Sequence, residues 1–202
     1  DDYTEKYASN KININIVPNY FVSVNQVPAG NVSIKPLKEI YRKGDVLFFN
    51  ISPKEGWIFS GFNEIGMPPD SGYVVSKDIT LEPIYKTKVK LNPLGEGYIF
   101  MHKRNYDGYL EYGEKVYVEA VPNKNNYLYK FAGDLSGHRY FTEYVASEKT
   151  PSFTAVFRTL KPGEVRLDVG KYGKGDVEVT PDKPVYNNND TVTLKAKPYS
   201  VK

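Results

Sequence analysis

The sequence predicts an all-β fold made of small antiparallel β modules in tandem. First, the chain of 202 residues contains 18 Tyr and 10 Phe, and aromatic residues favour strands. Second, 14 Pro and 16 Gly interrupt it at short intervals, which indicates many short elements rather than long helices. Third, one pattern of residues recurs along the chain, which is typical of a modular array.

The recurring pattern consists of an aromatic residue, a turn, an acidic residue, an alternating strand and a proline. It is found in residues 39–62, 109–131 and 185–198. The aromatic residues that begin it are Tyr41, Tyr112 and Tyr186, and the prolines that end it are Pro53, Pro122 and Pro198. The prolines lie 69 and 76 residues apart (122 minus 53, and 198 minus 122), so each module has roughly 70 residues.

The pattern predicts two complete modules and one partial module. We expect residues 1–19 to be a leader that includes the closing strand of a preceding module, 20–86 to be module one, 87–159 module two and 164–202 a partial module three. The expected strands are 20–26, 31–36, 45–52, 56–62 and 73–85, the last with a break near 76–78, then 87–92, 97–102, 114–121, 127–131 and 152–158, and finally 165–169, 176–180 and 190–197. Periodicity leaves open whether a module is β-grasp-like or an Ig-like sandwich. A module of roughly 70 residues buries only about 60% of its unfolded surface and depends on its neighbours.

Composition excludes several classes of function. The net charge is +3, from 27 basic and 24 acidic residues mixed along the chain, so no nucleic-acid partner is expected. The absence of Cys excludes disulfides and thiolate chemistry. The longest apolar run is Val46–Phe49, too short for membrane insertion. The chain begins at Asp1 and shows no signal peptide, so we interpret it as a segment of a longer protein.

No group of residues predicts an enzyme. Asp134, Ser136 and His138 alternate, but a catalytic triad is assembled from separated segments, so they are expected to be loop residues. His102 and His138 are the only histidines, and their spacing matches no metal motif. We therefore expect no catalytic residue, no metal site and no cofactor.

Several motifs resemble the divergent InlB B-repeat family of bacterial surface and secreted proteins. The run Gly173–Pro181 followed by Thr191–Pro198 resembles the start of that repeat. Gly56–Phe62 is similar to its aromatic strand and Thr154–Arg158 to its closing strand. The resemblance covers about 20–198 and implies a small β module used in extracellular spacers and adhesin stalks, with no catalytic residues to carry over.

The aromatic residues of the alternating strands have two interpretations. They are predicted to form the core of each module, because a small sheet needs large side chains to bury enough area; the residues concerned are Trp57, Phe59, Phe62, Tyr127, Tyr129 and Phe131. The alternative is an exposed aromatic strip that stacks on sugar rings. A second candidate surface lies in 132–150, interpreted as an insertion without a counterpart in module one; its candidate binding residues are Arg139, Tyr140, Phe141 and Tyr144.

The leading functional hypothesis is a non-catalytic extracellular or cell-surface segment that spaces or presents other domains of a bacterial protein. The alternative is a carbohydrate- or protein-binding module of an exported enzyme or adhesin. The expected partners are neighbouring domains of the same polypeptide, with a polysaccharide or a host or cell-surface protein as candidate ligands. Apolar residues such as Val177 and Leu194 in the partial module predict packing against module two or head-to-tail self-association through residues 10–17. An exposed row of aromatic side chains would favour the binding hypothesis.

Overall fold

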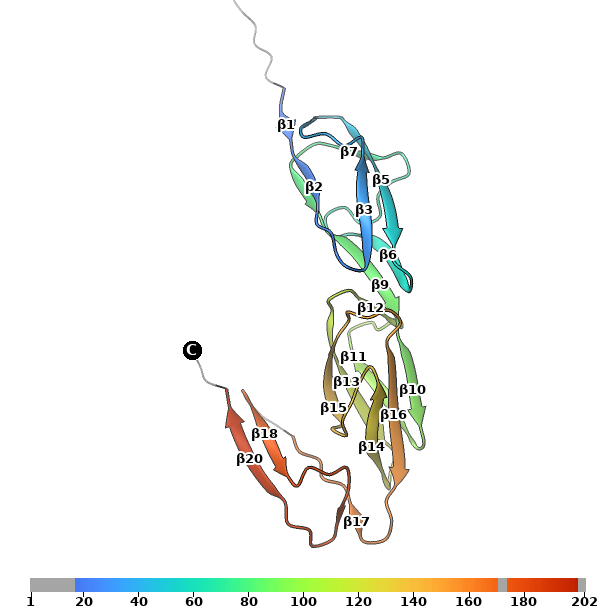
Figure 1. Cartoon of the computed structure of the whole chain (residues 1–202), viewed down its shortest axis with the longest axis vertical. Helices are drawn as coiled ribbons and strands as arrows, with labels where there is room; N and C mark the ends of the chain where they lie inside the picture. Colours follow the sequence, from blue (N-terminus) through green and yellow to red (C-terminus); the bar gives the residue numbers. More distant parts are fainter. Residues whose placement is uncertain (1–16, 171–173, 200–202) are drawn as a thin grey trace, which may run out of the picture. The chain divides into compact units, whose positions relative to one another are not determined.

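The computed structural model describes residues 17–170 and 174–199 and is all-β (Figure 1). All of its regular elements are strands, β1 to β20, and none of the described segments is a helix of the length and apolarity that crossing a bilayer requires. The chain divides into two compact units. One runs to Ser52 and includes Gly61–Pro83, and the other contains Pro53–Ser60 and the chain from Ile84 onward.

Module one is built from short sheets around a small core. Its strands are β1 (Asn19–Tyr20), β2 (Val22–Val24), β3 (Gly30–Lys35), β4 (Tyr41–Arg42), β5 (Val46–Pro53), β6 (Trp57–Phe62), β7 (Tyr73–Val74) and β8 (Ile79–Leu81). The sheets have the orders β3-β5-β7, β2-β8 and β1-β4. β3 alternates buried and exposed residues, because its apolar side chains recur at every second position. Among the buried ones, Ile34 packs with Tyr41, Leu47 and Val75.

Module two is a sandwich of two three-stranded sheets. Its strands are β9 (Pro83–Lys88), β10 (Lys90–Leu94), β11 (Gly97–His102), β12 (Tyr109–Glu111), β13 (Lys115–Pro122), β14 (Asn126–Gly133), β15 (Phe141–Val145) and β16 (Ser152–Thr159). The sheets β11-β13-β15 and β10-β16-β14 supply one common core, which includes Met101, Val118, Phe131 and Phe153. A third sheet has the order β12-β9-β6. The core of module two thus lies between two three-stranded sheets.

Two expectations about the strands need correction. The expected strand 73–85 is three elements, β7, β8 and the start of β9: it has the expected break, which covers 75–78, and a second interruption at Glu82. The modules are also not purely antiparallel, since β2 pairs with β8 and β10 with β16 in parallel. A parallel pair requires a long crossover connection, and alternation within a strand carries no information about its direction.

Module three consists of two antiparallel pairs. β17 (Glu164–Val165) pairs with β19 (Tyr186–Asn187), and β18 (Gly175–Thr180) pairs with β20 (Thr193–Pro198). Every residue of β20 is exposed, including Leu194, whereas Val179 and Tyr186 are buried. In the β18–β20 pair, β18 therefore buries part of its apolar surface, whereas the side chains of β20 are all exposed.

The same hydrogen bonds occur in modules one and three at an offset of 145 residues (186 minus 41). The buried hydroxyl of Tyr41 donates to the Pro36 carbonyl oxygen at 3.0 Å and accepts from the Lys38 backbone N–H at 3.0 Å. The Tyr186 hydroxyl makes the equivalent bonds to Pro181 at 2.8 Å and from Lys183 at 3.2 Å. In modules one and three, a buried tyrosine thus holds a proline-containing turn in place through its hydroxyl group.

An acidic residue closes the next turn in all three modules. Asp45 accepts from the Arg42 backbone N–H at 3.0 Å, Glu114 from Glu111 at 2.9 Å and Asp190 from Asn187 at 3.0 Å. The hydrogen bond from the Lys38 side chain, followed by that backbone bond, lowers the pKa of Asp45. In Asp190 the backbone bond from Asn187 is the main cause of a lowered pKa.

This register corrects one of the sequence matches. Counted from the acidic residue, the counterpart of Tyr41 and Tyr186 in module two is Leu110, which is fully buried, and not Tyr112. The Tyr112 ring instead contacts the Trp57 ring, with centroids 5.5 Å apart. A search for an aromatic residue at this position selects Tyr112 wrongly, because module two has a leucine where the other two modules have a tyrosine.

The hydroxyl bonds of Tyr41 and Tyr186 lead to a stability prediction. Tyr41→Phe and Tyr186→Phe each remove two hydrogen bonds and leave a turn N–H and a carbonyl without their partner, which costs about 1–3 kcal/mol of unfolding free energy. Denaturant unfolding of the purified chain measures this cost. Tyr98→Phe, at a half-exposed position, is the control and should change the free energy by less than about 0.5 kcal/mol. Two variants as stable as the control would show that the hydroxyls are not needed.

Most of the predicted core aromatic residues are buried. Trp57, Phe62, Tyr127 and Phe131 lie in the core, whereas Phe59 and Tyr129 are half-buried. The register of β14 shifts between Leu128 and Lys130, so Tyr129 leaves the inward alternation. Its ring instead lies under the Arg158 guanidinium, 3.4 Å from the centroid.

Module three contacts module two, one of the two arrangements expected for it. Asp182 accepts from His138 at 3.1 Å and from Arg139 at 3.5 Å, and Arg166 donates to the Asn126 carbonyl oxygen at 3.5 Å. The alternative partner is residues 10–17, of which 10–16 lie outside the described part of the chain. The expectation of head-to-tail self-association therefore stays a prediction.

Candidate functional site

The four candidate binding residues lie on both sides of one strand and the loop before it. Phe141 and Arg139 are exposed, and Phe141 begins β15. Tyr140 and Tyr144 pack against the core of module two, and burial raises the pKa of both hydroxyls. The structure thus exposes Arg139 and Phe141, whereas the rings of Tyr140 and Tyr144 are partly buried against the core, because alternate residues of a strand point to opposite faces.

The segment that carries them is not a pure insertion. Tyr144 of β15 lies opposite Val116, as Tyr73 of β7 lies opposite Leu47 in module one. The backbone bonds that follow also match, Gly113 to Ala146 at 2.7 Å and Gly44 to Val75 at 2.8 Å. The expectation that 132–150 has no counterpart in module one is therefore wrong for 144–146. What module two adds is the longer first part of β15, which includes Phe141 and Glu143.

The exposed side of the sheet β11-β13-β15 carries a cluster of rings, which we call the aromatic face. It consists of Tyr98, Phe100 and His102 on β11, Tyr117 on β13 and Phe141 on β15. The exposed fractions are 52% for Tyr98, 48% for Phe100, 41% for Tyr117 and 51% for Phe141. Between them, Ile99, Met101, Val116 and Val118 point into the core, so the face follows directly from strand alternation.

Ring contacts connect Phe100, His102, Tyr117 and Phe141, both along β11 and across the strands. Tyr117 and Phe141 stack with centroids 5.1 Å apart and an angle of 16° between their planes. His102 makes edge contacts with Phe100 at 4.8 Å and with Phe141 at 5.0 Å. Cross-strand aromatic pairs of this kind hold their rings in place, so the face is preorganised rather than a set of independent mobile side chains.

A histidine–carboxylate hydrogen bond and a salt bridge lie among the rings. The Nε2 atom of His102 is 2.7 Å from the Glu119 carboxylate, and Lys115 is 2.9 Å from the Glu143 carboxylate. The hydrogen bond with Glu143 raises the pKa of Lys115, and the same bond lowers the pKa of Glu143. The charged groups of this face are thus paired with each other. They leave hydrogen-bonding atoms at the surface without a strong net charge.

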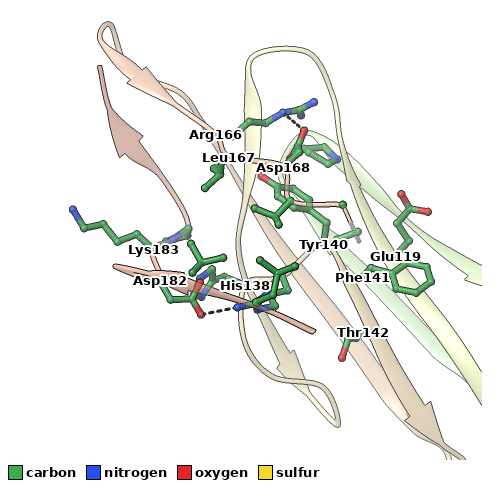
Figure 2. Close-up of a pocket in the computed structure, with 18 of the residues that line it drawn as sticks. Glu119, His138, Tyr140, Phe141, Thr142, Arg166, Leu167, Asp168, Asp182 and Lys183 are labelled. Atoms are coloured by element: carbon green, nitrogen blue, oxygen red, sulfur yellow. Dashed lines mark hydrogen bonds and ion pairs between the residues drawn. The ribbon is translucent and has the colours of Figure 1, made fainter. Parts of the chain in front are cut away.

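One edge of the aromatic face continues into a cavity of about 1110 Å³ between module two and module three (Figure 2). Module two lines it with Tyr117, Glu119, Phe141 and the turn at His138–Tyr140, and module three with 166–170, Val177, Asp182 and Lys183. Figure 2 shows the His138–Asp182 contact at the wall that joins the two modules. This cavity is a groove open to the same surface as the rings.

The other residues singled out in the sequence do not form a catalytic or metal centre. The Asp134 carboxylate accepts from the Ser152 backbone N–H at 2.7 Å, and His138 contacts Asp182 of module three, so neither is directed at Ser136. No cluster of three or more His, Asp or Glu side chains that would hold a metal ion occurs in the part of the chain that the structure describes.

Sequence patterns missed the aromatic face for a specific reason. Along β11 the exposed Tyr98 and Phe100 alternate with the buried Ile99 and Met101, so both sides of the strand are apolar. An apolar run without polar positions indicates a strand but not which side faces solvent. The candidate Phe141 was found, but as part of a loop rather than of this sheet.

Modules one and three carry mainly polar residues at the positions of the aromatic face. In module three the strand pairing places Asp176, Glu178, Thr180 and Thr193 at the positions of Tyr98, Phe100, His102 and Tyr117. At the 145-residue offset, module one has Asn31, Ser33, Lys35 and Phe48 there. The module fold therefore forms without a cluster of rings at these positions.

A scan against protein-family models, a search of curated proteins and a search of solved structures each found no match for this chain.

Proposed function

We propose that this chain is a non-catalytic segment of an exported bacterial protein, in which tandem β modules hold and present a binding face on module two. The observation that carries the proposal is the exposed aromatic face, together with the polar residues at the same positions of modules one and three. The export part of the proposal rests on the resemblance to bacterial surface repeats.

The exposure of the aromatic face supports a role in binding, because its rings add nothing to the core. Single exposed apolar residues are ordinary on soluble proteins, whereas a contiguous cluster of them rimmed by polar groups indicates an interaction site, because such a cluster contributes to association rather than to folding. Tyr117 could be replaced by the Thr found at its position in module three without loss of core contacts, since its ring and the ring of Phe141 point away from the core. Their retention on one module is best explained by a ligand.

Presentation of that face is consistent with the way module three contacts module two. The contacts from His138 and Arg139 to Asp182 join the two modules beside the groove. Exposed ion pairs of this kind contribute little stability each, so they orient the neighbouring module rather than create a large core. Spacing and binding are then two aspects of one function.

The proposal predicts that binding depends on the aromatic face and not on exposed aromatic residues in general. The double variant Tyr117→Ala and Phe141→Ala should lose retention on isolated bacterial cell walls, on polysaccharide and on extracellular-matrix protein, whichever of these retains the wild-type chain. The matched control is Phe48→Ala, which removes an exposed ring at the position of Tyr117 in module one. Thermal unfolding and circular dichroism check that both variants fold. Equal retention of the wild type and the double variant would exclude this face as the binding surface.

A further inference from the structure

We infer that the aromatic face binds a short stretch of a neutral polysaccharide chain; this inference rests on the proposed binding function and names its ligand class. Three properties of the face carry it: its size, its charge balance and the mixture of ring surfaces with paired hydrogen-bonding groups. Each of them distinguishes a neutral glycan from the other partners that an exposed apolar surface can take.

The size of the aromatic face favours a small ligand over a folded protein. Tyr98 and His102 are four residues apart on β11, which is about 14 Å at the rise of about 3.4 Å per residue in a strand. β13 separates β11 from β15, so Phe141 lies about 10 Å across the sheet from β11. The face thus spans about 14 Å by about 10 Å and carries five rings, whereas a stable protein partner or a second copy of the chain needs about 20–30 residues from each side.

The charge balance of the aromatic face favours a neutral polymer. The acidic residues on this side of the sheet are Glu119 and Glu143 and the basic residue is Lys115; Lys115 pairs with Glu143, and Glu119 forms a hydrogen bond with the His102 ring. A polyanionic glycan would meet two carboxylates beside the rings, and a cationic polymer would meet a lysine. Because the face has no cluster of like charges, it offers little electrostatic attraction to steer a charged ligand here.

The arrangement of groups matches the chemistry of a pyranose ring. One face of such a ring consists of C–H groups, which pack on aromatic carbon, and its edge consists of hydroxyl groups, which donate and accept hydrogen bonds. Tyr98 and Phe100 offer half-exposed rings on β11, and Glu119 and His102, both 37% exposed, lie beside them. Tyrosine combines an apolar body with a hydroxyl that bonds at its edge.

The groove beside the rings favours a polymer over a single sugar. Tyr117, Glu119 and Phe141 belong both to the aromatic face and to the lining of the cavity toward module three. A chain lying on the rings therefore continues into a space whose module-three wall carries Asp182 and Lys183 (Figure 2). Sugar units on both parts bind together, which raises the affinity above that of a monosaccharide.

The test titrates the whole isotopically labelled chain with three probes, followed by amide chemical shifts: a neutral gluco-oligosaccharide, a neutral manno-oligosaccharide and an oligouronate. The expected result is saturable shifts in β11, β13 and β15 with at least one neutral probe and no comparable binding of the oligouronate. Tyr117→Ala with Phe141→Ala should weaken that binding at least tenfold, Glu119→Gln should weaken it less, and Phe48→Ala should leave it unchanged. The neutral monosaccharide of the bound probe should bind more weakly than the oligosaccharide.

The outcomes separate the ligand class from the proposed function. Binding of the oligouronate alone would overturn the neutral class. Absence of binding to all three probes, while the retention on cell walls or matrix protein is still lost in the double variant, would overturn the glycan inference and leave the binding function in place. Retention that does not depend on Tyr117 and Phe141 would overturn both. A change in mass on sedimentation that the double variant abolishes would assign the face to a second copy of the chain instead.

Discussion

Trp57→Ala is expected to lower the unfolding free energy of the second compact unit by about 3–5 kcal/mol, because it removes the largest buried ring there and leaves a cavity. The Trp57 side chain is 9% exposed, and its ring meets Tyr112 edge-on at 5.5 Å. Its backbone N–H also donates to the Lys54 carbonyl oxygen at 3.0 Å in the turn between β5 and β6, and alanine retains this bond. The loss is therefore one of packing and not of the turn.

Chemical denaturation of the purified chain measures this effect, with tryptophan-independent circular dichroism as the signal. Ile58→Ala is the matched control, since Ile58 is the next residue of β6 and is 54% exposed; it should cost less than about 1 kcal/mol. A double-mutant cycle with Tyr112→Ala should show a coupling of about 0.5–1.5 kcal/mol from the ring pair. An unchanged midpoint for Trp57→Ala would mean that the ring is not part of the core.

Gly133→Ala is expected to cost about 2–5 kcal/mol, from about 1–2 for a left-handed backbone and about 1–3 for overpacking. Gly133 ends β14 with φ = +83° and lies opposite Phe153 in β16. A methyl group there would collide with the backbone carbonyl oxygen of Ser152, which is held by strand pairing and cannot move aside. Both the backbone conformation and the close approach therefore require glycine.

Gly137→Ala separates the two contributions to that cost. Gly137 also has a positive φ, +90°, but an added methyl group meets no atom within 4 Å. Its carbonyl oxygen still accepts from the Phe131 N–H, so the variant should lose only the conformational part, about 1–2 kcal/mol. Equal losses for the two variants, measured by denaturant unfolding, would exclude the steric contact with Ser152 as a cause.

The turns and strands of this protein were predicted well where the information is local. The acidic residues Asp45 and Asp190 close the turns that their spacing indicated. Strand β16, with Phe153, Ala155 and Phe157 buried, has the alternation expected of it. The core positions Phe62 and Phe131 likewise follow from their place on alternating strands.

Predictions were weaker where one position accepts several residue types. Leu110 takes the place that Tyr41 and Tyr186 have in the other modules, so a search for a third tyrosine chose Tyr112 instead. The first part of β15 was assigned to a loop, because its partner β13 lies more than 20 residues earlier in the chain. Of the candidate binding residues, Phe141 lies on the aromatic face and Arg139 beside the groove, whereas Tyr140 and Tyr144 pack on the core.

The sequence by itself determined that this chain is all-β and divided into small units, because alternation and turn residues act within a few positions of the chain. Only the tertiary structure decided which side of β11 faces solvent, since Tyr98 and Phe100 are as apolar as Ile99 and Met101. It also decided that these rings meet Tyr117 and Phe141. Strand pairing brings together residues that are far apart in the chain, and the pairing depends on the packing of a whole core rather than on any local pattern.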